Sequence, residues 1–239
     1  MPAASVRAAV GFLTRIPVGR VDGADVARGA FAFPLVGAGI GAVGAGVALV
    51  VHPALSPPVA AALAVAAMTA LTGALHLDGL ADTADALGGG SRERALEIMR
   101  DSRIGSFGAA AVGLDLLLRV TVIAQLLGGA VVGPLVAAGA LSRASSVVLS
   151  ALLPYPRENG TGSVLSSRVS SSAAGVIGVA VAVVALRGDA AFVAGAVALT
   201  TIVLGLAFWR WLGGATGDAL GAASEVGEIV ALLVAAGLR

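Results

Sequence analysis

The sequence contains no cysteine and no lysine, and only 12% of its 239 residues are charged. The lack of cysteine excludes disulfides and thiolate chemistry. The lack of lysine excludes a Walker A phosphate-binding loop, and with it ATP hydrolysis at such a loop. The low charge argues against a soluble domain, in which roughly 25% of residues are charged. Aromatic residues are also scarce, at 4%.

Apolar sequence takes up most of the chain. Hydrophobic residues make up 58% of the sequence, and the mean hydropathy is +0.98. Apolar runs of about 20 residues, the length of one transmembrane helix, recur along the chain. Small residues, including 34 glycines, let such helices approach closely. No long polar linker divides the chain, so the composition predicts an all-α fold, a polytopic transmembrane bundle forming one integral-membrane domain over residues 1–239.

The apolar runs predict about seven spans. The fifth run is short, so it is either tilted or paired with the sixth as a hairpin. The seventh contains acidic residues, so it is either a span or a half-buried helix. Residues 3–17 are amphipathic, which is typical of a helix that lies on the membrane surface. The seven runs are 31–51, 58–77, 105–127, 131–153, 173–187, 190–208 and 216–237.

The distribution of arginine predicts the orientation of the bundle. Eleven arginines fall in the connections on one side, and two fall on the other. Basic connections favour the cytoplasmic side, so the N-terminus and the 78–104 loop are expected to be cytoplasmic. The eleven are Arg7, Arg15, Arg20, Arg28, Arg92, Arg94, Arg100, Arg103, Arg157, Arg168 and Arg210, and the two are Arg187 and Arg239.

Three aspartates follow the second apolar run, in LTGALHLDGLADTADALGGG at residues 71–90. Asp78, Asp82 and Asp85 are spaced i, i+4, i+7, which places them on one face of a helix. Like charges near a bilayer repel and lose water, so a cation is expected to offset the cost. Carboxylates suit Mg²⁺, with Mn²⁺ as a second candidate. His76 is a fourth ligand, a proton carrier or a headgroup-level residue. The alternative is a solvated helix end without a ligand.

A second polar segment, SRERALEIMRDSRIGSFG at residues 91–108, interleaves acids with arginines. Glu97 and Asp101 share a helix face, and Arg100 and Arg103 lie beside them. Such a segment suits a metal–phosphate site, in which acids hold the cation and guanidinium groups hold phosphate oxygens. The alternative is a salt-bridged amphipathic helix without a ligand.

Acidic residues also lie inside the last apolar run, in GGATGDALGAASEVGE at residues 213–228. Asp218 and Glu225 share a face through their i, i+7 spacing, and Glu228 follows. Carboxylates within a membrane are functional candidates. They either complete the metal site, bind a nucleoside hydroxyl, or join helices through polar contacts.

Three further charges lie inside predicted spans. Asp115 and Arg119 are spaced i, i+4 and are expected to form a structural pair. Arg143 has no acid near it in the sequence. It is expected to face the bundle interior, where it is a candidate for contact with a phosphate.

A cation held by carboxylates beside arginines provides what phosphoryl transfer requires, namely positioning and neutralisation of charge on phosphate oxygens. A Ser–His–Asp triad is not supported. His52 and His76 are the only histidines, and His52 falls in a predicted outer loop.

In order and spacing, six segments resemble the adenosylcobinamide-GDP ribazoletransferase family, also called cobalamin synthases. The resemblance runs through most of the chain, and the acidic motifs show no departure from it. The segments are FLTRIPVG at 12–19, RGAFAFPLVGAGIGA at 28–42, GALHLDGLADTADAL at 73–87, RALEIMRDSRIGSFG at 94–108, LSRASS at 141–146 and GGATGDALGAASEVGE at 213–228.

The resemblance implies a Mg²⁺-dependent enzyme of the bacterial inner membrane that assembles the nucleotide loop of cobalamin. Its substrates would be adenosylcobinamide-GDP and α-ribazole, or α-ribazole 5′-phosphate, and its products adenosylcobalamin, or the 5′-phosphate, and GMP. The active site would face the cytoplasm. The lipid bilayer would be a partner and nucleic acid would not. Whether the chain forms a homo-oligomer stays open.

The resemblance also implies a set of site residues. A ribazole hydroxyl would attack the phosphorus on the cobinamide side, and GMP would leave. Which carboxylate takes the hydroxyl proton stays open. The expected metal ligands are Asp78, Asp82, Asp85, Glu97 and Asp101, the catalytic candidates are His76, Asp82, Asp85 and Glu97, and the substrate-binding candidates are Arg15, Arg100, Arg103, Arg143, Asp218, Glu225 and Glu228.

Three other kinds of membrane protein compete with this interpretation. CDP-alcohol phosphotransferases follow Asp-Gly with Ala-Arg, whereas Asp78-Gly79 is followed by Leu-Ala-Asp. Membrane prenyltransferases, the alternative among Mg²⁺-dependent enzymes acting on diphosphates, would be expected to have more aromatic linings. A transporter predicts acids at the membrane midplane and broken-helix repeats, and the sequence shows no such repeat.

Overall fold

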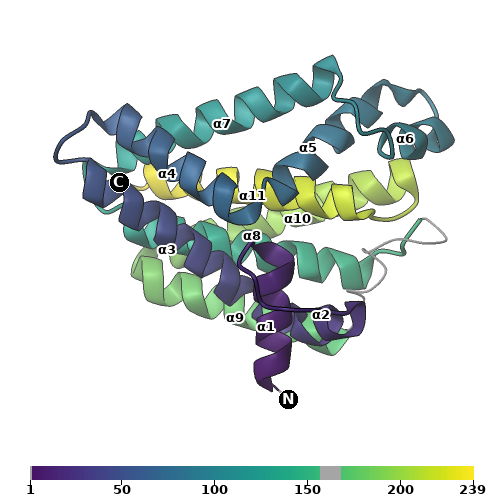
Figure 1. The fold of residues 1–239 in the computed structure, drawn as a ribbon, viewed down its shortest axis with the longest axis horizontal. Helices are drawn as coiled ribbons and strands as arrows, with labels where there is room; N and C mark the ends of the chain where they lie inside the picture. The colour runs from purple at the N-terminus through teal and green to yellow at the C-terminus, as the bar shows by residue number, and fades with distance from the viewer. Residues whose placement is uncertain (1, 157–167) are drawn as a thin grey trace.

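The computed structural model describes residues 2–156 and 168–239, and within these ranges the chain forms helices joined by turns and loops, with no strand. The all-α prediction is therefore confirmed. Arg157, counted above among the basic loop residues, lies outside the described residues. Figure 1 shows the helices α1 Pro2–Leu13, α2 Gly23–Gly29, α3 Phe33–Val51, α4 Pro57–Thr72, α5 Leu75–Ala86, α6 Arg92–Ile98, α7 Ser106–Leu126, α8 Val132–Leu152, α9 Arg168–Leu186, α10 Ala190–Leu212 and α11 Gly217–Gly237.

The described helices make an integral membrane protein. Five helical stretches are long and apolar enough to cross a membrane, or six with the bent pair α4–α5. The longest stretch, Ser170–Leu212, contains α9 and α10. Gly133 at the start of α8 lies against Ala185 late in α9, whereas Gly205 late in α10 lies against Leu149 near the end of α8. α9 is therefore antiparallel to α8 and α10 is parallel to it, so α9 and α10 form a hairpin, one of the two arrangements that the sequence left open. The architecture is roughly consistent with seven spans.

Small residues allow the central helices to touch. A Cβ atom on Gly37 of α3 would overlap the carbonyl oxygen of Gly139 of α8, and a Cβ on Gly139 would overlap that of Gly37. Larger residues at either position would push the two helices apart. Large apolar side chains such as Leu117, Val184 and Ile202 are exposed on the outer helices α7, α9 and α10. This outer apolar surface is what lipid contact requires.

The predicted span 58–77 is interrupted. α4 ends at Thr72, and α5 leaves it at an angle of 91°. Gly73 and Ala74 both adopt left-handed backbone conformations, with φ of 64° and 59°. Glycine adopts this conformation readily, and the side chain of Arg15 lies so close to Gly73 that a Cβ there would overlap the Arg15 guanidinium. The break carries the aspartates of α5 away from the apolar run.

The N-terminal segment is helical over only part of the predicted length. α1 ends at Leu13, and residues 15–22 are irregular. Ala8, Ala9 and Leu13 are buried, so α1 packs one face against the rest of the protein. In Figure 1, α1 runs across the long helices rather than along them.

Candidate functional site

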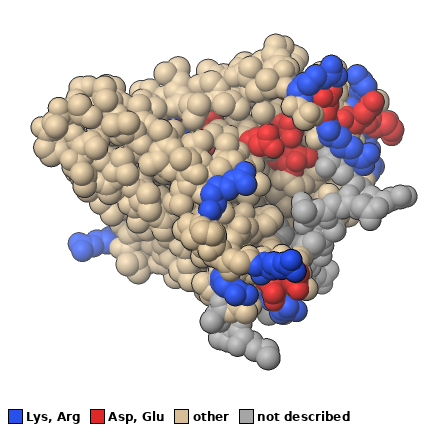
Figure 2. All heavy atoms as spheres, viewed as in Figure 1, with Lys and Arg blue, Asp and Glu red and all other residues tan. Residues whose placement is uncertain are grey.

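Charged side chains gather at one end of the molecule. In the view of Figure 2, most of them lie over α5, α6 and the N-terminal helices, and the rest of the visible face is largely uncharged. The acidic residues predicted as a site on α5 and around α6 therefore lie where the apolar bundle ends.

A cavity of about 270 Å³ lies at this end. Five helices contribute to it, namely α1, α3, α5, α8 and α11. Its wall combines aromatic, aliphatic and polar groups, which is the usual character of a small-molecule site. The lining residues are Phe12, Phe33, Leu75, His76, Asp78, Gly79, Ser146, Gly217, Asp218, Leu220 and Gly221.

Close packing of α5 on α11 brings two distant carboxylates to this cavity. A Cβ on Gly79 would lie 2.8 Å from the carbonyl oxygen of Asp218, and a Cβ on Gly221 would lie 3.4 Å from Gly79 Cα. The hydroxyl oxygen of Thr216 accepts the Ala219 N–H at 3.1 Å and caps the start of α11. Asp78 and Asp218, far apart in the sequence, therefore line the same cavity.

His76 forms part of the inner wall. Its side chain is buried, with 7% of its surface exposed, and its Nδ1 atom has no hydrogen-bond partner. A buried polar atom without a partner costs about 1–3 kcal/mol. The Nδ1 atom is enclosed by the protein and not exposed to the cavity, so a catalytic role of His76 stays a prediction.

The three aspartates of α5 lie on one helix, as predicted, but they face different surroundings. Asp78 is exposed and lines the cavity, and Asp82 is half-buried one turn further along. Asp85 instead accepts the backbone N–H groups of Gly105 and Gly108 at 2.7 and 2.8 Å. Both carboxylate oxygens of Asp85 thus cap the start of α7, a role that the sequence spacing did not indicate.

The segment around α6 forms exposed ion pairs. Arg94 pairs with Glu97 at 2.6 Å, and Arg103 pairs with Asp101 at 2.6 Å. Hydrogen bonds from Arg103 lower the pKa of Asp101 to about 2. The Arg94–Glu97 pair matches the salt-bridged helix named above as the alternative. The prediction that Glu97 and Asp101 share a helix face was wrong, because α6 ends at Ile98. None of these residues lines the cavity. Catalytic or ligand roles for Glu97 and Asp101, and diphosphate binding by Arg100 and Arg103, stay predictions.

The charges inside the bundle form one buried network. Arg119 pairs with Asp115 at 2.9 Å, as predicted, with Glu228 at 2.8 Å, and also with Glu225. Arg143 pairs with Glu228, a partner that the sequence did not reveal. All five side chains are buried. Their contacts join α7, α8 and α11 in the interior, so substrate binding by Arg143, Glu225 and Glu228 stays a prediction that these contacts do not require.

Arg15 lies beside the cavity. Its backbone N–H donates to the carbonyl oxygen of Leu71 at 2.8 Å, and its side chain covers Gly73, two residues before the cavity residue Leu75. The side chain is exposed, and no carboxylate of the described residues forms an ion pair with it. The Arg15 side chain is therefore available to an anionic group near the cavity.

The carboxylates predicted as metal ligands are not gathered at one point. Among residues 2–156 and 168–239, no group of three or more histidine or acidic side chains is placed to hold a metal ion. Asp78 and Asp218 nevertheless share the cavity. Mg²⁺ is commonly bound through one or two carboxylates together with water and substrate phosphates. This pair fits Mg²⁺ that binds with a diphosphate, rather than a metal site built by protein alone.

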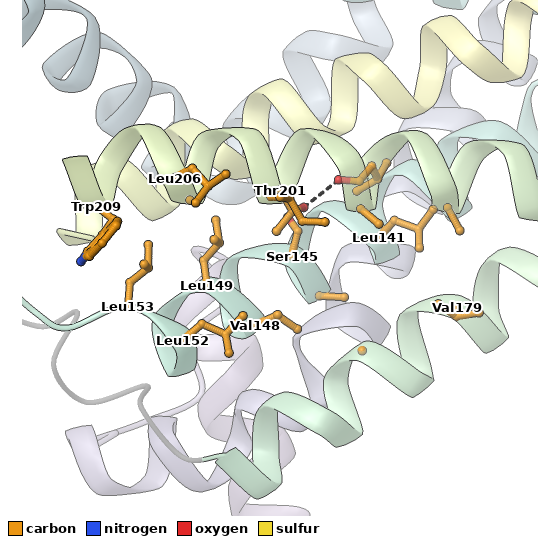
Figure 3. Close-up of a pocket in the computed structure, with 17 residues that line it drawn as sticks. Leu141, Ser145, Val148, Leu149, Leu152, Leu153, Val179, Thr201, Leu206 and Trp209 are labelled. Carbon is orange, nitrogen blue, oxygen red and sulfur yellow. Dashed lines mark hydrogen bonds between the residues drawn. The ribbon is translucent and has the colours of Figure 1, made fainter. Parts of the chain in front are cut away.

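A larger cavity of about 420 Å³ lies among α8, α9 and α10. Figure 3 shows apolar side chains such as Leu149, Leu206 and Trp209 around it. Its two hydroxyl groups are satisfied within their own helices, since Ser145 donates to Ser142 and Thr201 donates to Val197, each at 2.7 Å. This cavity offers nothing to a phosphate, so the chemistry is assigned to the smaller one.

Eight of the eleven residues that line the smaller cavity were missed as site residues, among them Phe12, Phe33 and Ser146. Phe12 begins FLTRIPVG, Phe33 lies in RGAFAFPLVGAGIGA, and Ser146 ends LSRASS. All three lie in segments that carry the family resemblance, and that was the available signal. Their convergence depends on the packing of α1, α3 and α8, which local sequence does not show.

Residues 5–236 match the family described as cobalamin-5-phosphate synthase. The chain is also similar to proteins of Escherichia coli and Shigella flexneri that are each named adenosylcobinamide-GDP ribazoletransferase. Each is 39% identical over 240 residues, covering 95% of this chain and 96% of the relative. No solved structure matches the chain.

Proposed function

The chain belongs to the cobalamin-5-phosphate synthase family, and we propose that it transfers the cobinamide phosphate of adenosylcobinamide-GDP to α-ribazole or its 5′-phosphate. It is thus an enzyme of cobalamin nucleotide-loop assembly. The observation that carries this proposal is the match over nearly the whole chain to relatives named for the reaction. The same match disfavours a membrane prenyltransferase.

The reaction exchanges one phosphorus–oxygen bond for another. A ribazole hydroxyl oxygen bonds to the phosphorus on the cobinamide side, the bond between that phosphorus and the bridging oxygen breaks, and GMP leaves with the bridging oxygen. The hydroxyl proton passes to a base of the site. Asp82 and His76, both beside Asp78 on α5, are the candidates for that base. Arg15, whose side chain covers Gly73 near the cavity, would hold a diphosphate oxygen.

Mg²⁺ is the proposed cofactor. Asp78 and Asp218 would hold it, with Asp82 one turn away on α5. When bound, it would neutralise negative charge on the diphosphate oxygens. Asp85, Glu97 and Asp101 do not line the cavity, and we place them outside this first set.

The proposed location is the bacterial inner membrane with the cavity on the cytoplasmic side. The support is the excess of arginine on the connections at the cavity end of the bundle, since basic connections favour the cytoplasm. Both proposed substrates are polar and would then reach the cavity without crossing the membrane.

The test is turnover by the purified chain in detergent. With adenosylcobinamide-GDP, α-ribazole and Mg²⁺, the wild-type protein is expected to release GMP. Asp78→Asn is expected to lower kcat by about 100-fold, as expected when an electrostatic contact to the reacting phosphate is lost. Asp189→Asn, in the turn between α9 and α10, is the matched control and should keep wild-type turnover.

Two results would contradict the proposal. The first is a folded wild-type preparation that releases no GMP. The second is full turnover by Asp78→Asn, which would leave the reaction in place but remove this cavity from it.

A further inference from the structure

The larger cavity, among α8, α9 and α10, opens on the outside of the bundle. Its floor is buried, since Leu149 and Val197 are each 3% exposed. Its rim is open, since Leu152 is 73% exposed and Ile202 is 59% exposed. All three helices belong to stretches that are long and apolar enough to cross a membrane. The opening therefore faces the hydrocarbon of the bilayer.

Small residues keep this cavity empty and make it long. On α10 the lining residues recur every one to four positions from Ala194 to Trp209, along one helix face about 22 Å in length. One leaflet of the hydrocarbon core is about 15 Å thick, so an acyl chain of one leaflet fits along this face. The lining residues without a large side chain are Ala144, Gly175, Ala194, Ala198 and Gly205.

The interior of the larger cavity presents no free hydrogen-bond donor. The hydroxyl groups of Ser145 and Thr201 donate to backbone carbonyl oxygens of their own helices, and apart from Trp209 the other lining residues are aliphatic. An acceptor group brought into this space would be left unpaired at a cost. The occupant that suits the interior is therefore hydrocarbon.

One end of the larger cavity is polar. Figure 3 shows Trp209 at that end, and Trp209 is 55% exposed. Arg210 follows it and is also exposed, and no carboxylate of the described residues forms an ion pair with it. Tryptophan is enriched where a membrane meets water, and arginine holds phosphate oxygens through paired N–H groups. This end therefore suits a phospholipid headgroup.

We propose that the larger cavity binds one acyl chain of an anionic phospholipid. The chain lies along α10 from Trp209 toward Ala194, and the headgroup phosphate meets the guanidinium group of Arg210. The indole N–H of Trp209 donates to an oxygen of the headgroup region. The negative charge of the lipid is offset by Arg210, which selects it over a zwitterionic lipid. This site lies outside the cavity of Asp78 and Asp218 and does not depend on the proposed reaction.

The test follows the fluorescence of Trp209. Trp211→Phe protein keeps Trp209 as its one tryptophan and is placed in phosphatidylcholine vesicles that contain a small fraction of a lipid brominated in its acyl chains. Bromine quenches tryptophan on contact. Brominated phosphatidylglycerol is expected to quench Trp209 with about fivefold higher apparent affinity than brominated phosphatidylcholine, the selectivity that one arginine at an anionic membrane surface provides.

Arg210→Gln in this background tests the headgroup contact. It removes the charge, so the quenching by the two brominated lipids is expected to become equal. Arg187→Gln, at the opposite end of the α9–α10 hairpin, is the matched control and should keep the fivefold preference.

Ala198→Phe tests the cavity itself. The substitution adds a ring at an exposed position of α10 that lines the cavity, so it occupies the space of the acyl chain without a buried clash. It is expected to abolish the preference for phosphatidylglycerol, although Arg210 is still present. Ala62→Phe, at an exposed alanine of α4 outside the cavity, should keep it.

Three results would overturn the proposal. The first is equal quenching by the two lipids before any cavity substitution. The second is a preference that persists in Ala198→Phe or in Arg210→Gln, which would place the lipid elsewhere on the surface. The third is loss of the preference when adenosylcobinamide-GDP is added, which would assign the cavity to substrate. None of these measurements requires GMP release, so they stand apart from the test of the proposed reaction.

Discussion

Helix α11 carries carboxylates in two different environments. Asp218 in its first turn lines a cavity at the end of the bundle. Glu228, about three turns further along, is 1% exposed and pairs with Arg119 and Arg143. A carboxylate deep among apolar helices is tolerated when cations offset its charge. A carboxylate at a helix end can reach water and ligands. Position along α11 therefore distinguishes Glu228, which stabilises the fold, from Asp218, which is proposed to act in the reaction.

Glu228→Ala gives the largest expected effect. The substitution leaves Arg119 and Arg143 with fewer acidic partners in the interior, and breaking a buried ion pair costs about 3–5 kcal/mol. We expect a large fall in the thermal unfolding temperature measured in detergent. Glu97→Ala, which removes one partner of an exposed pair, is the control and should unfold near the wild-type temperature. An unchanged unfolding temperature for Glu228→Ala would show that Glu228 does not stabilise the fold.

Asp218→Asn tests whether the carboxylate of Asp218 acts in the reaction rather than in the fold. It keeps the size of the side chain but removes its charge at the cavity. We expect kcat for GMP release to fall by about 100-fold, the scale of losing one electrostatic contact in a transition state. The unfolding temperature should stay within a few degrees of wild type. A variant that loses stability in proportion to activity would show that Asp218, like Glu228, acts on the fold.

The Arg103–Asp101 pair is exposed, so the smallest effect is expected there. Arg103→Ala should raise KM for adenosylcobinamide-GDP a few-fold if Arg103 reaches the diphosphate. Stability should hardly change, because exposed ion pairs contribute little. Unchanged KM and kcat would remove Arg103 from the substrate site.

The same pair makes a prediction about pH. Arg103 lowers the pKa of folded Asp101 to about 2, below the value of about 3.9 for a free aspartate. The resulting stabilisation is present above about pH 3.9 and is lost as the pH falls toward 2. In Arg103→Ala, an NMR titration should show the Asp101 pKa returning toward 3.9. A pKa that stays near 2 would show that the backbone N–H of residue 103, rather than the guanidinium group, holds it down.

Features that depend only on helical periodicity were predicted correctly from the sequence. Runs 105–127 and 131–153 match α7 and α8 within a residue or two. The Asp115–Arg119 pair was also predictable, because residues four apart on a helix are neighbours. The shared helix of Asp78, Asp82 and Asp85 follows from the same periodicity. The family could likewise be identified from short segments in order.

Other features required the tertiary structure. The 91° bend after Thr72 occurs within the apolar run 58–77, which was predicted to be one continuous helix. It depends on two left-handed residues, one of them the non-glycine Ala74, and on Arg15 from another segment. The capping of α7 by Asp85 and the pairing of Arg143 with Glu228 join residues from separate elements.

The sequence by itself determined that this chain is a helical membrane protein of the cobalamin-5-phosphate synthase family, with acids and arginines concentrated near helix ends. Composition and helical periodicity are local properties, and they require no knowledge of which helices touch. The tertiary structure decided which carboxylates share a cavity, which cap a helix and which pair with arginine. Those assignments depend on contacts between distant segments, such as Gly79 against Asp218, that only the packed bundle defines.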